Sequence, residues 1–238
     1  MVKPYESDKT KKEEVALMFN NIAHKYDFLN HFFSLGIDFL WRKKAIRLLK
    51  KNSPKSVLDL ATGTADFAIA ARKLKPNRIV GADISKGMVD IGKVKVKKKN
   101  LQDLITLEIG DSENLRFEDN EFDALTVGFG VRNYGDLKKG LGEMLRVVKP
   151  GGNLAILEFS KPTKFPVKQA FSFYFKYIMP VLGNWLAKDQ AAYTYLPESV
   201  QAFPSGQDFV DILNEVGYKN VKVYPLSGGI ASIYFGEK

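Results

Sequence analysis

Cysteine is absent from this chain of 238 residues. Without cysteine the protein forms no disulfide bond, builds no thiolate metal site and has no cysteine nucleophile. Histidine is almost as rare, because only His24 and His31 are present. Two histidines are too few for a histidine-rich metal site, so we expect a functional site without a metal ion.

Long apolar runs are missing too. The longest uncharged stretch, Val223–Gly236, has 14 residues and contains Pro225, Gly228 and Gly229. A membrane-spanning helix needs ~18 apolar residues, so none is expected. The first residues show no signal-peptide pattern, since Val15–Phe19 is their one apolar run of note. We therefore expect a cytoplasmic protein, with peripheral contact at the inner face of the membrane left open.

Positive charge is in excess, with a formal net charge of +9. One lysine cluster supplies much of it, and its simplest interpretation is the solvated C-terminal end of a helix, where ammonium groups suit the helix dipole. An anionic membrane surface is the alternative, and no nucleic-acid partner is expected. The cluster consists of Lys93, Lys95, Lys97, Lys98 and Lys99.

From Ser56 onwards, segments of strand type and helix type alternate along the chain. This alternation predicts an α/β fold with a mostly parallel sheet and right-handed crossovers. The predicted strands lie near 56–61, 78–83, 104–109, 123–128, 153–159, 219–225 and 230–236, and the helices near 65–74, 86–99, 136–148 and 206–216.

The segment 56–66 combines a short apolar run, a turn of small residues and the start of a helix. Gly63 permits a positive φ and a close approach to a ligand, and the helix adds N–H groups and a positive dipole end. A nicotinamide site needs G-x-G-x-x-G, whereas this turn has one glycine. Asp83 follows twenty residues after Gly63, about the offset at which a carboxylate meets ribose hydroxyls.

Asp59 on the first strand, the small-residue turn and Asp83 together resemble the Rossmann-like (class I) methyltransferases that use S-adenosylmethionine (SAM). The resemblance implies a sheet closed by a hairpin with one antiparallel strand. It also implies that Asp59 lies near the methionine amino group and that Asp83 binds the ribose. An ordinary strand–turn–helix is the alternative.

The third and fourth strands also end in polar or flexible residues, Asp111 and Ser112 after the third and 128–133 after the fourth. Asp111 suits a hydrogen bond to an adenine amino group, which Ser112 could support. The Thr64 hydroxyl and the N–H groups of the turn would hold the methionine carboxylate. Helix caps and turn residues are the alternative explanation for these side chains.

Three stretches resemble motifs of the menaquinone/ubiquinone-biosynthesis C-methyltransferase family, the UbiE/MenG type: 26–41, 128–133 and 146–160, the last ending Leu-Glu-Phe-Ser. The resemblance implies methyl transfer from SAM to a ring carbon of a polyprenyl quinol, with demethylmenaquinol favoured. A 2-polyprenyl-6-methoxybenzoquinol and a non-catalytic SAM-binding subunit stay open. The SAM contacts that it implies are Thr64, Asp83, Asp111 and Ser112.

The chain departs from the family pattern at two positions of the site. Ala65 stands where the turn usually has a glycine, which is acceptable if its φ is negative. Gly128 stands where relatives often have a serine, so it is not counted as a site residue. A nucleic-acid methyltransferase is disfavoured, because Gly-Phe-Gly replaces the Asn/Asp-Pro-Pro-aromatic motif of amino-directed enzymes.

Methyl transfer to a ring carbon needs aligned reactants and a polarised quinol hydroxyl. Arginine is a poor base, but the Arg132 cation would stabilise a quinolate. For Tyr26 and Asp27, a buried hydrogen bond at a helix end is the alternative role. The candidates for binding and activating the quinol are Arg132, Asn133, Tyr26 and Asp27.

Residues 1–55 are predicted to form an N-terminal helical cap, with 1–9 disordered, and 56–238 a SAM-binding domain. An aromatic lid is inserted at about 161–200. Its segment 165–186 has too many apolar side chains for a helix packed on one side. A lipid tunnel, a bilayer contact, core packing and a homodimer interface all explain this surplus, and a soluble substrate stays open if the segment is buried.

Overall fold

The computed structural model describes residues 2–5, 7–34, 36–178 and 190–238. A seven-stranded sheet lies at its centre, in the order β3-β2-β1-β4-β5-β7-β6. β1 to β5 run parallel, and β7 is antiparallel to both of its neighbours. The predicted fold class is therefore confirmed. The strands are β1 (Ser56–Leu60), β2 (Arg78–Asp83), β3 (Ile105–Ile109), β4 (Phe122–Gly128), β5 (Val148–Phe159), β6 (Lys219–Leu226) and β7 (Ala231–Glu237).

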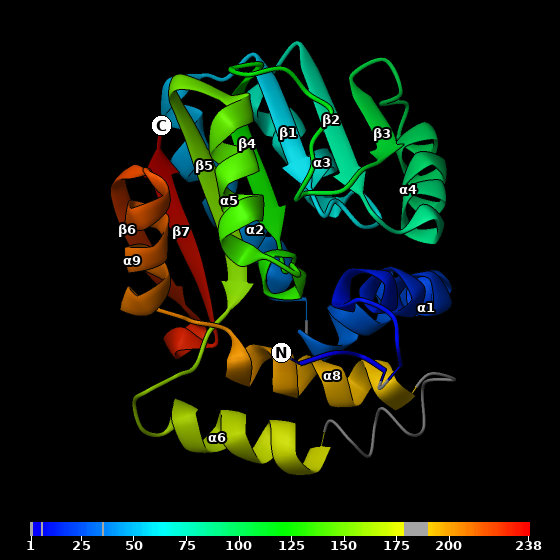
Figure 1. The fold of residues 1–238 in the computed structure, drawn as a ribbon, viewed down its shortest axis with the longest axis vertical. Coiled ribbons are helices and arrows are strands. Elements are labelled where there is room, and N and C mark those ends of the chain that lie inside the picture. The colour runs from blue at the N-terminus through cyan, green and yellow to red at the C-terminus, as the bar shows by residue number, and fades with distance from the viewer. Residues whose placement is uncertain (1, 6, 35, 179–189) are drawn as a thin grey trace.

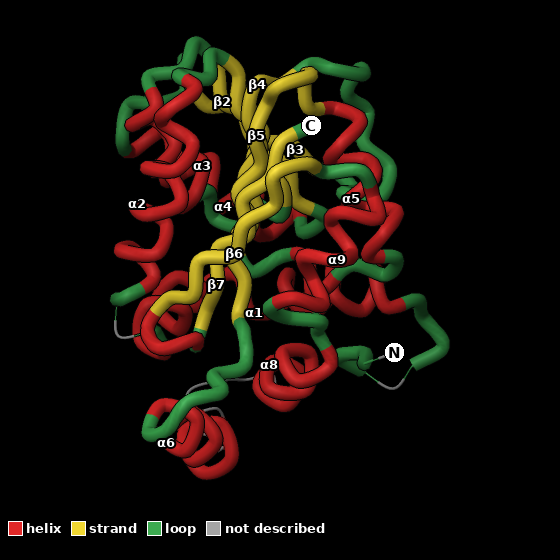
Figure 2. The backbone as a smooth tube through the Cα atoms, turned by 90° about the vertical axis from the view of Figure 1, so that its left-hand side faces the viewer, coloured by secondary structure: helices red, strands yellow, loops and turns green. Residues whose placement is uncertain are grey.

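Helices cover both faces of the sheet, as Figure 2 shows. One layer holds α2, α3 and α4, and the other holds α5 and α9 (Figure 2). Both layers are required, because central parallel strands are apolar on both faces, and all five residues of β1 are buried. The bounds are α2 (Asp38–Leu49), α3 (Asp66–Ala71), α4 (Lys86–Lys98), α5 (Leu137–Val147) and α9 (Gln207–Val216).

Each face of the sheet has its own apolar core. On the first face, Trp41 of α2 and Phe67 of α3 pack in one cluster with residues of β1 and β2. On the second face, Met144 of α5 packs with Phe209 of α9 and Tyr234 of β7. The two cores hold the strands rigidly, so the loops at the strand ends start from fixed positions.

Three more helices lie beyond the carboxyl ends of the parallel strands (Figure 1). They are α1 (Lys11–Phe33), α6 (Val167–Phe173) and α8 (Gln190–Ala202). α1 packs against α4 and α8, and a π-helical turn, Tyr174–Ile178, continues α6. Both the beginning of the chain and the region between β5 and α9 therefore contribute to this end of the molecule.

Residues 2–5 and 7–9 are ordered, so the prediction of disorder for 1–9 is wrong for these residues. The buried carboxylate of Glu14 accepts hydrogen bonds from the N–H groups of Tyr5 and Ser7, at 2.8 and 3.1 Å, and from the Ser7 hydroxyl. A buried carboxylate is stable only with such donors, and they come from the segment before α1.

β5 begins five residues earlier than the predicted strand near 153–159. α5 ends at Val147, as its sequence indicates, but Val148 is already extended and pairs with Phe122 of β4. The register then shifts, so that Ala124 pairs with Asn153, and Gly151 takes a φ of +78° within the irregular stretch. The Pro-Gly-Gly segment therefore makes an irregular part of the strand instead of a turn before it.

Among the described residues, no helix combines the length and the apolar character that crossing a bilayer requires. The boundary at residue 55 stays a prediction. The two helices before it differ in place, since α1 lies over the strand ends whereas α2 packs on the sheet against β5 and α3.

Candidate active site

The turn after β1 takes a left-handed conformation at three alternate residues. The φ angles are +49° at Ala61, +55° at Gly63 and +71° at Ala65. Gly63 thus takes the positive φ that glycine permits, whereas Ala65 does not meet the condition of a negative φ under which alanine would be acceptable there. α4 comes so close to this turn that a Cβ on Gly92 would lie 3.3 Å from the Thr64 carbonyl carbon. Packing against α4 thus holds Ala65 in a conformation that costs about 1–2 kcal/mol.

Asp83 ties this turn to the end of β2. Its two oxygens accept hydrogen bonds from the N–H groups of Gly63 and Ser85, both at 2.8 Å. A carboxylate has about four acceptor sites, so two remain. Burial raises the pKa of Asp83, and the two N–H donors act against this shift. Asp83 and Gly63 both line a cavity at the carboxyl ends of the strands.

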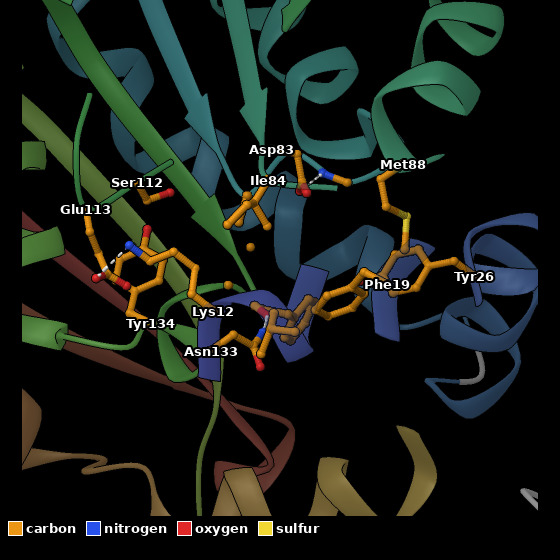
Figure 3. A pocket seen from close by; sticks show the side chains of 16 residues that line it. Lys12, Phe19, Tyr26, Asp83, Ile84, Met88, Ser112, Glu113, Asn133 and Tyr134 are labelled. Carbon is orange, nitrogen blue, oxygen red and sulfur yellow. Dashed lines mark hydrogen bonds and ion pairs between the residues drawn. The ribbon is translucent and has the colours of Figure 1, made fainter. Parts of the chain in front are cut away.

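This first cavity has a volume of about 70 Å³ and a partly polar wall, which Figure 3 shows from close by. Ser112, Asn133 and Tyr134 line it from the strand ends. Lys12 of α1 also lines it, and its Nζ lies 3.1 Å from Glu113 Oε2 (Figure 3) and 2.7 Å from Asp111 Oδ2. Asp111 is thus held beside the cavity by Lys12.

Asp59 lies outside the wall of this cavity. Its carboxylate is fully buried and accepts hydrogen bonds from the hydroxyls of Thr62 and Thr126, both at 2.6 Å. Burial raises the pKa of Asp59 to about 6, and these hydroxyls oppose the shift. The structure therefore gives Asp59 a supporting place below the turn, and its predicted contact with the cofactor stays a prediction.

A second cavity of about 500 Å³ lies next to the first and has a mostly apolar wall. Helices α1, α6 and α8, together with the ends of β4 and β5, contribute its lining. Phe19, Tyr26 and Phe129 line both cavities. The two spaces therefore meet at these three rings, of which Phe19 and Tyr26 pack edge to face with centroids 5.9 Å apart.

Arg132 lines the second cavity and is fixed by a buried ion pair. Its Nη1 lies 2.8 Å from Glu158 Oε1 and donates to the Phe129 carbonyl at 2.5 Å. Its guanidinium carbon lies 5.6 Å from the centroid of the Phe159 ring, a cation–π distance. Within the described residues, the buried Arg132 Nε has no hydrogen-bond partner. Burial raises the pKa of Glu158, and the nearby Arg132 cation acts against this shift.

Asn133 and Tyr26 lie on the walls close to Arg132. The Tyr195 hydroxyl of α8 donates to Asn133 Oδ1 at 3.0 Å, and Asn133 Nδ2 donates to the Phe129 carbonyl at 3.3 Å. Burial raises the pKa of both Tyr26 and Tyr195 to about 12. Three of the four predicted catalytic residues, Tyr26, Arg132 and Asn133, are therefore brought together around the two cavities.

Asp27 and Thr64 pair with each other away from the cavity walls. Thr64 donates its hydroxyl to Asp27 Oδ1, and Lys95 Nζ lies 2.5 Å from Asp27 Oδ2. Of the predicted cofactor residues, Gly63, Asp83 and Ser112 line the first cavity, and Asp59, Thr64 and Asp111 lie behind or beside it. Their roles toward a cofactor stay predictions.

Lys12, Glu158 and Tyr195 are site residues that sequence reasoning missed. Glu158 had a usable signal, because a lone acid inside a strand buried on both sides needs a cationic partner. Lys12 and Tyr195 had none, since each lies in a helix far along the chain from the strand ends that it contacts. Among the described residues, no cluster of three or more histidine, cysteine or acidic side chains could hold a metal ion.

The model of the ubiE/COQ5 methyltransferase family matches residues 7–238. The chain belongs to this family. A demethylmenaquinone methyltransferase of Bacteroides fragilis is 49% identical over 238 residues, which cover 100% of this chain and 97% of that protein. The ubiquinone/menaquinone biosynthesis C-methyltransferase UbiE of Geobacter sp. strain M21 is 44% identical, and the match covers 96% of this chain and 97% of that protein.

Solved structures agree on the fold. A SAM-dependent methyltransferase of Thermotoga maritima superposes with a TM-score of 0.65 at 18% identity, covering 93% of this chain and 99% of that one. The family membership makes this protein a SAM-dependent C-methyltransferase of quinone biosynthesis, as its motifs predicted.

We expect Asp59→Asn to change how stability depends on pH. The pKa of about 6 in the folded state lies above the ordinary 3.8, so the stability that Asp59 contributes is fully present below about pH 4 and is lost as the pH rises through 6. This pKa difference corresponds to ~3 kcal/mol. The free energy of unfolding, measured with urea, is compared between the wild type and Asp59→Asn. From about pH 4 to pH 7 it should fall by up to ~3 kcal/mol more in the wild type than in the variant.

The control for this measurement is Asp103→Asn, which changes an exposed aspartate. Its difference from the wild type should not depend on pH in the same range. A pH-independent difference for Asp59→Asn would contradict the assignment of a raised pKa to Asp59.

Proposed function

We propose that this enzyme transfers the methyl group of SAM to a ring carbon of a polyprenyl quinol, with demethylmenaquinol as the favoured acceptor. The observation that carries the proposal is the pair of adjacent cavities. One is partly polar and lies at the strand ends, the other is apolar and about 500 Å³ in volume, and both share Phe19, Tyr26 and Phe129. Donor and acceptor sites that meet at a common wall suit direct transfer.

The first cavity fits SAM in the chemistry of its donors and acceptors. Asp83 keeps two acceptor sites for ribose hydroxyls, Gly63 presents backbone without a side chain, and Ser112 adds a hydroxyl. When bound, SAM supplies an electrophilic methyl group on a sulfonium. A ligand of that size needs more than about 70 Å³, and withdrawal of the long Lys12 side chain from Asp111 and Glu113 would provide room.

The second cavity fits a quinol ring with an isoprenoid tail, because its wall is mostly apolar and its size lies in the range of ligand pockets. Arg132 supplies a polar group to this wall. Its Nε–H has no partner among the described residues, so it can donate to a quinol oxygen and stabilise the quinolate that carbon methylation requires. Glu158 and the Phe129 carbonyl hold the guanidinium in one orientation. Tyr26, which lines both cavities, and Asn133, which lines the first cavity and is oriented by Tyr195, complete the group that we assign to the acceptor.

A methyl-transfer assay with isotope-labelled SAM tests the proposal. The acceptors are reduced demethylmenaquinone and a reduced polyprenyl methoxybenzoquinone. Label on the naphthoquinol alone supports the favoured acceptor, and label on both rings indicates an enzyme of two pathways. The full-length match to a relative named for demethylmenaquinone favours the first result. If neither ring is labelled although SAM binds, the quinol assignment is wrong and a non-catalytic role or a soluble acceptor replaces it.

Arg132→Lys should lower kcat by about 100-fold, because it keeps a positive charge but loses the fixed Nε–H donor. The affinity for S-adenosylhomocysteine should stay within about twofold, since Arg132 lines the second cavity and not the first. Arg116→Lys, at an exposed arginine, is the matched control. A folded Arg132→Lys variant with unchanged kcat would contradict the role.

We further propose that the enzyme works in the cytoplasm, with α6 and the start of α2 against the inner face of the membrane. Phe165 and Phe173 are 80% and 57% exposed, and Leu40 is 64% exposed. Pro166 and Ile37, next to these two groups, line the same second cavity. Exposed lysines flank Phe165, so an anionic lipid surface suits this face and would deliver the quinol tail to the cavity.

Flotation with vesicles containing phosphatidylglycerol should show binding that Phe165→Ser/Phe173→Ser weakens at least tenfold, since each ring loses roughly 2 kcal/mol of apolar burial. Val94→Ser/Ile109→Ser removes two apolar side chains elsewhere that are 54% and 53% exposed, and this variant should bind like the wild type. The homodimer interface would be favoured instead by two results together. The wild type would form a dimer in light scattering without binding vesicles, and Phe165→Ser/Phe173→Ser would dissociate that dimer. Residues 179–186 of the predicted aromatic segment lie outside the described residues.

A further inference from the structure

A cluster of charged and polar side chains lies behind the cofactor turn, outside both cavities. Lys95 of α4 is at its centre, and its side chain is only 19% exposed. Its Nζ lies 2.5 Å from Asp27 Oδ2 of α1, 2.7 Å from Asp66 Oδ1 of α3 and 3.0 Å from Thr64 Oγ1. The Lys95 ammonium group therefore connects α4 to α1, to α3 and to the turn after β1.

The position of Lys95 on α4 explains why it points inward. Gly92 and Lys95 are three residues apart and so share a helix face. Gly92 packs against the turn, because a Cβ there would lie 3.3 Å from the Thr64 carbonyl carbon and 3.5 Å from Ala65 Cβ. Lys93 and Lys97 on either side are exposed. The lysine cluster is therefore divided, and one member belongs to the interior.

The charges in the cluster make Lys95 necessary for its geometry. Asp27 and Asp66 both direct a carboxylate oxygen at the same ammonium group, and Thr64 donates its hydroxyl to Asp27. Arg42 Nη2 is farther from Asp66, at 3.9 Å, and its Nη1 pairs with the buried Asp38. Without Lys95 two carboxylates on different helices would face each other across a buried hydroxyl.

Two residues of the charged cluster directly follow, in the sequence, residues that line the cavities. Asp27 follows Tyr26 on α1, and Thr64 follows Gly63 in the turn. The Tyr26 ring lies over Gly63, since a Cβ on the glycine would be in ordinary van der Waals contact with Tyr26 Cε1, at 3.8 Å. Tyr26 lines both cavities and Gly63 lines the first. The Asp27–Lys95 pair therefore sets where α1 sits on the turn.

We propose that Lys95 is a positioning residue for SAM binding, which locks Asp27 of α1 to the cofactor turn and so fixes Tyr26 against Gly63. It acts through these residues and does not touch either reactant. The inference rests on the proposed function only for the use of SAM, and not for the identity of the acceptor.

The test measures S-adenosylhomocysteine binding by titration calorimetry, which needs no acceptor. Lys95→Met should weaken binding about tenfold and raise KM for SAM by a similar factor while changing kcat less. Lys95→Arg, which restores a cation, should recover most of the affinity. Lys97→Met, at an exposed lysine two positions along the same helix, should bind like the wild type.

Asp27→Asn supplies the second arm, because it keeps the cation and removes one carboxylate. It should also weaken binding, and the double variant Asp27→Asn/Lys95→Met should be little weaker than Lys95→Met alone, since both changes break one link. If Lys95→Met does not fold, Asp27→Asn and Lys95→Arg carry the test.

Affinity within twofold of the wild type in Lys95→Met and Asp27→Asn overturns the proposal, as does an equal loss in Lys97→Met. Fully additive losses in the double variant also overturn it. If the wild type methylates neither quinol, the binding results still decide the role of Lys95, so the two failures are distinguishable.

Discussion

The hydrogen bond from the Gly63 N–H to the Asp83 carboxylate, 2.8 Å long, holds the part of the structure on which the rest depends. It joins the turn after β1 to the end of β2, its parallel neighbour, and keeps that turn in a left-handed conformation. Tyr26 of α1 packs on Gly63, and Thr64, the next residue, bonds to Asp27. The turn therefore places the helix that closes the strand ends, and both cavities take their common wall from this contact.

Asp59, Asp83 and Glu158 have buried carboxylates at this end of the sheet, and each is matched by donors that include another segment of the chain. Asp59 accepts from hydroxyls of the turn and of β4, Asp83 accepts from two N–H groups, and Glu158 accepts from Arg132. Burying a carboxylate costs free energy unless it is hydrogen-bonded or paired, so the strand ends and loops are held in the one arrangement that supplies these donors. The same requirement orients the guanidinium of Arg132 beside the apolar cavity.

Much of the fold was predictable because the signals are local. The β2 bounds 78–83 agree with the prediction, and α4 differs by one residue, since apolar spacing and caps are written in neighbouring positions. β5 started early because Val148 pairs with Phe122, a contact between distant segments. The positive φ of Ala65 has a similar origin, because α4 presses on the turn at Gly92. Local propensity contains neither contact.

The sequence by itself determined the family, the α/β sheet closed by a hairpin with one antiparallel strand, and the strand ends at which functional residues gather. Only the tertiary structure decided which of those side chains face a cavity. In the structure Asp59 lies below the turn, and Thr64 pairs with Asp27. Lys12, Glu158 and Tyr195 lie at the site. The physical reason is that the end of a strand fixes the position of a residue's backbone. The direction of its side chain depends on hydrogen-bond donors, charges and packing from helices that are remote in the chain. Lys95 shows this most clearly, since Lys93 and Lys97 have the same side chain and are exposed, whereas Lys95 meets the carboxylates of α1 and α3.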